Sequence, residues 1–124
     1  VQRFIAEVWP KMSSEVDIYV APLVHTKYSA SNSWVKALEY GASKKSCVLE
    51  DFGPYKDFGG HSPEEKGVFL ADSTKEWFDA LEKLVLSESL RKEMGERLYN
   101  EVKKNHTIQG NKQVYETYLT DLVK

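Results

Sequence analysis

The chain has 124 residues, of which 41% are hydrophobic, 12% aromatic and 29% charged. This content excludes a disordered chain, and the length fits one domain with its own core. Seventeen Lys and Arg against 19 Asp and Glu give a net charge of -2, which argues against a nucleic-acid surface. The single cysteine, Cys47, excludes a disulfide framework and a cysteine-rich zinc site.

Targeting and membrane signals are not visible in the sequence. No apolar run approaches the roughly 18 residues of a transmembrane helix, and no signal peptide is recognisable. We therefore expect a cytoplasmic protein, with membrane association of a full-length protein left open. The chain begins with Val1 rather than Met, so we expect the natural chain to be longer.

The first 50 residues predict a helix, a strand, a second helix and a second strand. Apolar spacing predicts the first helix over residues 2–12, with Pro10 disturbing its end. Residues 17–22 form a compact apolar run closed by proline, as a buried parallel strand does. A polar loop is expected before a helix that begins near Ser33, and residues 45–50 predict the second strand.

The remainder predicts one more strand and then helices. Residues 52–66 contain several Gly and Pro turn signals and predict a long loop. Residues 67–71 predict the third strand. A Ser-x-x-Glu capping box at Ser73 opens a helix, Ser87 opens another, and Thr107 is expected to cap the last one.

This order predicts an α/β fold with a Rossmann-like parallel sheet flanked by helices. Only three strands are visible, whereas a doubly wound nucleotide-binding domain has about five or six. We therefore interpret residues 1–124 as a single domain that corresponds to the second half of such a sheet. An exposed sheet edge would follow, which a second copy of the chain or an unseen segment would cover.

The best candidate site is the segment KYSASNSWVKALEYGA, from Lys27 to Ala42. It leads from the carboxyl end of a strand into a helix, where open α/β sheets bind ligands and helix-end amides favour phosphate. Ser33 could cap the helix and donate a hydroxyl, Lys36 could reach an anion, and Glu39 could accept both hydroxyls of a ribose. The alternative is that Ser33 only caps, and that Lys36 and Glu39 form an exposed ion pair.

Four segments resemble, in the same order, the carboxyl-terminal domain of GT-B glycosyltransferases, in particular the group-1 retaining enzymes. They are DIYVAPL, NSWVKALEYGA, CVLEDFGPY and the stretch that begins GVFLADSTKEWF. The resemblance runs from about Asp17 to Leu119. It implies the donor-binding half of a hexosyltransferase, whose substrate is a nucleotide diphosphate sugar and which needs no further cofactor. Surface polysaccharide biosynthesis is the expected setting. The acceptor-binding domain would lie elsewhere in the full chain, so the isolated chain should bind donor weakly without turnover.

The resemblance also implies which residues hold the donor. Glu39 stands in the family's L-E-Y triplet and would bind the ribose, while the amides at the start of its helix would bind the pyrophosphate. Many relatives have a second glutamate eight residues earlier, where this chain has Ser31. The expected donor-binding residues are Ser31, Asn32, Ser33, Trp34, Val35, Lys36 and Glu39.

Several other residues have a functional and a plain interpretation. His25 follows a strand end and could contact the donor, or it could be a solvated loop histidine. Pro54 and Tyr55 resemble a turn that borders the donor pocket in relatives, or they form an ordinary turn. His61 and His106 have no partner at metal-ligand spacing, so we assign no metal. No side chain is identified as a catalytic base.

Buried roles are expected for Cys47, as an inert thiol, and for Trp77, Phe78 and Tyr115, as core or domain-interface contacts. The alternative function is a non-catalytic module derived from the same fold, which binds a nucleotide or docks a protein partner through its open sheet edge.

Overall fold

The computed structural model describes residues 7–124 of the chain. Its centre is a parallel sheet with the strand order β1–β2–β3, formed by Ile18–Ala21, Ser46–Glu50 and Val68–Ala71. The register places Ile18 beside Ser46, and Cys47 beside Val68. The central strand β2 is buried along its whole length, as the run of apolar residues in it predicts.

Helices surround this sheet and connect its strands. Their bounds are α1 Trp9–Glu15, α2 Lys27–Ala30, α3 Val35–Ala42, α4 Gly53–Gly59, α5 Pro63–Lys66, α6 Thr74–Leu86, α7 Glu88–Asn105 and α8 Lys112–Leu122. The predicted α/β class with a parallel sheet flanked by helices is confirmed, and this shape is compatible with a Rossmann-like fold. Among residues 7–124, no helix is both long enough and apolar enough to cross a membrane.

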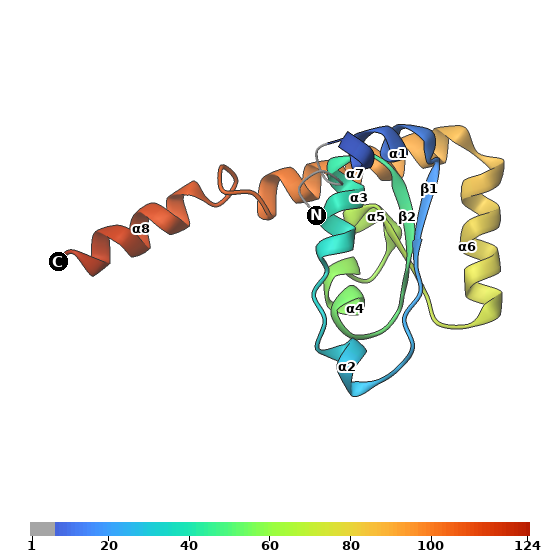
Figure 1. Ribbon diagram of the computed structural model, residues 1–124, viewed down its shortest axis with the longest axis horizontal. Coiled ribbons are helices and arrows are strands. Elements are labelled where there is room, and N and C mark those ends of the chain that lie inside the picture. The colour runs from blue at the N-terminus through green and yellow to red at the C-terminus, as the bar shows by residue number, and fades with distance from the viewer. Residues whose placement is uncertain (1–6) are drawn as a thin grey trace.

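Two hydrophobic clusters lie on opposite faces of the sheet, because successive strand residues point to opposite sides. Cys47 and Leu49 belong to the cluster beneath α3 and α4, whereas Val48 belongs to the cluster beneath α6. Figure 1 shows α6 on one side of the strands and α3 with α4 on the other. Helix α7 contributes to both clusters, with Leu98 in the cluster beneath α3 and α4 and Met94 in the cluster beneath α6.

Helix α7 approaches the rest of the domain at two glycines. A Cβ on Gly41 of α3 would stand 2.7 Å from Val102 of α7, so the two helices pack closely there. A Cβ on Gly95 of α7 would overlap the backbone carbonyl of Lys44, the residue that leads into β2 with a positive φ of 55°. Small residues at these positions therefore allow α7 to lie close to α3 and to the turn that leads into β2.

Two segments expected as loops contain helices. Residues 52–66 hold α4 and α5, and each begins with a proline in its first turn, at Pro54 and Pro63. Proline is tolerated there because a first-turn amide has no partner within its helix. Gly60 and Gly67, both with φ of 75°, end these helices. The turn signals therefore marked helix ends rather than one continuous loop. The expected loop after β1 likewise contains the single turn of α2.

Helix boundaries differ from expectation at three further places. Pro10 lies in the first turn of α1 and does not disturb its end, and residues 2–6 of the predicted helix lie outside the described residues. Trp34, not Ser33, is the N-cap of α3, and no side chain among residues 7–124 caps this helix. Asn111, not Thr107, is the N-cap of α8. The Thr107 hydroxyl donates to the Lys103 carbonyl and accepts from the Gly110 amide, within the turn between α7 and α8.

The predicted capping box is confirmed. The Ser73 hydroxyl accepts a hydrogen bond of 3.2 Å from the Glu76 amide, and the Glu76 carboxylate accepts one of 3.1 Å from the Ser73 amide. Of the three aromatics expected in the core or at a domain interface, Trp77 packs against the core. Phe78 and Tyr115 are 62% and 51% exposed, so neither packs in the core, and a contact at a domain interface stays a prediction for both. Helix α8 extends away from the domain in Figure 1 and buries none of its residues.

Candidate functional site

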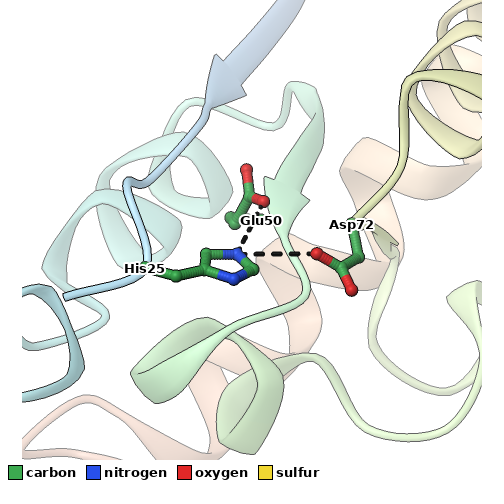
Figure 2. A group of neighbouring side chains, drawn as sticks. All are labelled: His25, Glu50 and Asp72. Carbon is green, nitrogen blue, oxygen red and sulfur yellow. Dashed lines mark hydrogen bonds and ion pairs between the residues drawn. The ribbon is translucent and has the colours of Figure 1, made fainter.

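The carboxyl ends of the three strands bring together one polar side chain each. His25 lies on the loop after β1, Glu50 is the last residue of β2, and Asp72 directly follows β3. The Nε2 atom of His25 lies 3.0 Å from Oε1 of Glu50 and 3.5 Å from Oδ1 of Asp72. Figure 2 shows this nitrogen directed between the two carboxylates. Parallel strands end at a common edge, so residues distant in sequence meet there.

Each member of this cluster is held by a second contact. Glu50 is only 6% exposed, and its other oxygen, Oε2, accepts a hydrogen bond of 3.3 Å from the Leu23 amide. The His25 imidazole stacks on the Phe52 ring, with centroids 4.2 Å apart and planes within 10°. The Asp72 amide donates to Glu76 at 2.8 Å, which ties the backbone at this position to the capping box. These contacts orient the side chains of Glu50 and His25 and hold the backbone at Asp72.

The cluster has an excess of negative charge. Within residues 7–124, neither Glu50 nor Asp72 forms an ion pair with a lysine or arginine, and His25 is the cationic partner of both only when protonated. A buried carboxylate without a permanent counter-charge is costly in a low-dielectric environment. The negative charge of the site can therefore attract a cation.

The predicted donor-binding residues lie on the loop and helix that follow β1. Ser31 ends α2 and its hydroxyl donates to the Lys27 carbonyl at 3.0 Å, while the Asn32 amide donates to the Ser29 carbonyl at 3.2 Å. The Trp34 ring lies against Phe58, with centroids 6.2 Å apart.

The first amides of α3 are available to a ligand. Among residues 7–124, none accepts a hydrogen bond from the amides of residues 33–36. These residues are exposed, including Val35 at 50%. Lys36 and Glu39 are exposed as well, and no ion pair joins them to one another or to another described residue. Both side chains are thus free to meet solvent or ligand, and the alternative of an exposed pair is not what the structure shows.

Two of the suggested donor-pocket residues are buried. Pro54 and Tyr55 form the first turn of α4, and Tyr55 is only 3% exposed, where burial raises the pKa of its hydroxyl. Both are buried, and Tyr55 belongs to the hydrophobic core, so neither lines an open surface. A cleft does lie nearby, beside the edge strand β3, with Asp51 and Lys56 among its lining residues. It includes none of the predicted donor-binding residues.

Sequence spacing missed Glu50 and Asp72, although a signal was present. Each stands at the last position of a predicted strand or immediately after it, where the ends of neighbouring parallel strands converge. His25 was named alone, and its partner Glu50 lies 25 residues further along the chain. Only the strand order makes them neighbours.

Comparison with known proteins finds no matching family model, curated protein or solved structure. The class that the chain belongs to is therefore given by its fold alone, an α/β domain with a three-stranded parallel sheet.

Proposed function

We propose that this chain is the nucleotide-sugar donor-binding part of a cytoplasmic glycosyltransferase. The complete enzyme would transfer a hexosyl-type group to an acceptor, in surface polysaccharide biosynthesis, and the acceptor-binding domain would lie elsewhere in the full chain. The observation that supports this proposal is the connection from β1 to α3. It starts at the carboxyl edge of a parallel sheet and ends in exposed helix-start amides with no acceptor among residues 7–124.

The diphosphate and the ribose of a nucleotide diphosphate each have a counterpart on this segment. Amides of residues 33–36 and the positive end of α3 suit the diphosphate, and the Lys36 ammonium adds a full positive charge. Glu39 lies almost one turn further along α3 and can accept two hydroxyls of a ribose. The Ser31 hydroxyl already donates to the Lys27 carbonyl, so at this position the sugar would meet a neutral oxygen rather than a carboxylate.

The mechanistic contribution of this chain would be electrostatic. Negative charge develops on the diphosphate as it leaves the sugar, and amides aimed at that charge stabilise the transition state without reorganising. The residues described here supply binding and orientation, whereas the acceptor would come from another domain. The isolated chain is therefore expected to bind a nucleotide diphosphate weakly and to show no turnover.

A second candidate function is that of an interaction module, and an exposed strand favours it. β1 forms one edge of the three-stranded sheet, and its Val20 is 47% exposed. Ile18 packs with the cluster beneath α6, and Val20 points to the same face because side chains alternate along a strand. An edge of this kind can pair with a second copy of the chain or with another protein.

Titration with UDP and with GDP, followed by amide NMR spectra, separates the two functions. We expect saturable shifts at residues 31–40, weakened about tenfold or more by Glu39→Ala or Lys36→Ala, because each substitution removes a charge-assisted contact. Lys112→Ala and Glu116→Ala are matched controls, since this exposed pair lies on α8. Absence of shifts at residues 31–40 with millimolar ligand would favour the interaction module.

A further inference from the structure

We propose that His25, Glu50 and Asp72 form a binding site for a divalent first-row transition-metal ion. The inference is independent of nucleotide binding, because it concerns the chain and the metal alone. Neither the sequence spacing nor the resemblance to glycosyltransferases indicates such a site. It is carried by the geometry, the burial and the charge of the three side chains.

The separations between the ligand atoms fit one coordination sphere. Zinc and similar ions bind histidine nitrogen and carboxylate oxygen at about 2.0–2.2 Å, so neighbouring ligand atoms stand about 3.0–3.5 Å apart in octahedral or tetrahedral geometry. His25 Nε2 lies 3.0 Å from the Glu50 oxygen and 3.5 Å from the Asp72 oxygen. All three atoms lie within 4.8 Å of one another. An ion can therefore enter between them with small side-chain movements.

Two of the three ligands, Glu50 and His25, are held in place by contacts outside the cluster. Glu50 is anchored through Oε2 by the Leu23 amide, which leaves Oε1 directed toward His25. The Phe52 ring fixes the plane of the His25 imidazole. Supporting contacts of this kind orient metal ligands and reduce the cost of bringing them together.

Charge gives an independent argument for a cation. Glu50 is more than nine-tenths buried, and no lysine or arginine among residues 7–124 pairs with it or with Asp72. With a neutral His25 the cluster carries two negative charges, and a protonated His25 would remove only one of them. A divalent ion neutralises both carboxylates and uses the neutral imidazole as its third ligand.

The ligand set selects the kind of ion. Imidazole nitrogen suits zinc, nickel and iron, whereas magnesium and calcium prefer oxygen ligands throughout. Three protein ligands leave at least one coordination position for water or for an oxygen of a bound molecule. The side chains of His25 and Asp72 are 44% and 58% exposed, so solvent can reach that position.

The test is a calorimetric titration of the metal-free chain with Zn²⁺, compared among three variants. We expect one site that Asp72→Asn and His25→Gln each weaken about tenfold or more, since each removes one of three ligands. His106→Gln is the matched control, because His106 Nε2 lies 3.5 Å from Glu101 in a second histidine–carboxylate pair. Its zinc affinity should equal that of the unmodified chain.

Cu²⁺ provides a readout that needs no variant, because it is paramagnetic, broadens NMR signals close to it, and suits an imidazole ligand. Amide signals of residues 23–25, 50–52 and 72–73 should broaden first on addition of substoichiometric Cu²⁺. The proposal is overturned if no zinc binding is measured, if Asp72→Asn and His25→Gln bind as tightly as the unmodified chain, or if broadening centres on His106 instead. In each case the His25–Glu50 contact would be a structural hydrogen bond only.

Discussion

The carboxylate of Glu50 accepts a hydrogen bond of 3.3 Å from the backbone amide of Leu23, which lies 27 residues earlier in the sequence. This bond joins the last residue of β2 to the loop that follows β1, and the second oxygen of the same carboxylate contacts His25. One buried side chain thus holds the start of the loop that continues to α3. Its removal should affect the stability of the whole domain.

We expect Glu50→Ala to lower the free energy of unfolding by about 1–3 kcal/mol, measured by urea denaturation in metal-free buffer. The substitution leaves the Leu23 amide without its acceptor and removes the partner of His25. Glu39→Ala is the control, because Glu39 is exposed and forms no ion pair with the described residues. Equal midpoints for the two variants would contradict the role given to Glu50.

Gly95→Ala should destabilise the protein although alanine favours helices. Inside an exposed helix this change would stabilise by about 1 kcal/mol. Here the new methyl group would overlap the Lys44 carbonyl, which is backbone and cannot rotate away, so we expect a net loss of about 1–3 kcal/mol. Asn100→Ala on the exposed face of the same helix should instead raise stability slightly. Thermal unfolding followed by circular dichroism distinguishes the opposite signs.

Alkaline pH should destabilise the protein through two buried groups. Burial raises the pKa of the Cys47 thiol from 9.0 to about 12, and burial with neighbouring Tyr55 raises that of Tyr40 from 10.0 to about 12. Above pH 9–10 the unfolded chain loses these protons while the folded chain keeps them. The free energy of unfolding therefore falls as pH rises toward 12, by at most about 1.4 kcal/mol per pH unit for each group.

Urea denaturation between pH 8 and pH 11 measures this slope, and Cys47→Ala should make it shallower. The same burial makes the thiol unreactive, so a thiol reagent at pH 8 should label Cys47 only after urea unfolds the chain. Rapid labelling of the folded protein would contradict the burial of β2.

Helix α8 should contribute little to stability. Its residues are all exposed, including Tyr118 at 69% and Leu122 at 80%. An isolated helix of 11 residues is marginal in water, because nucleation is costly and few bonds offset it. Amide hydrogen exchange should therefore be fast throughout α8 and slowest in β2. Protection of α8 comparable to β2 would mean that another molecule covers it.

The sequence by itself determined the local structure of this protein. Apolar runs placed three strands, and the Ser73 capping box placed the start of α6, because these signals act over a few residues. The prediction of one long loop over residues 52–66 was wrong, because proline and glycine mark the starts and ends of helices as well as loops. Pro54 and Pro63 lie in the first turns of α4 and α5.

Only the tertiary structure decided which polar groups meet. The parallel order of β1, β2 and β3 places His25, Glu50 and Asp72 at the same end of the sheet, although these residues are far apart in the sequence. The tertiary structure also leaves Phe78 exposed to solvent, although this residue has the same helical spacing as the core residues of α6. Local patterns fix helices and strands, whereas contacts between distant residues depend on strand order and on which face each neighbour covers.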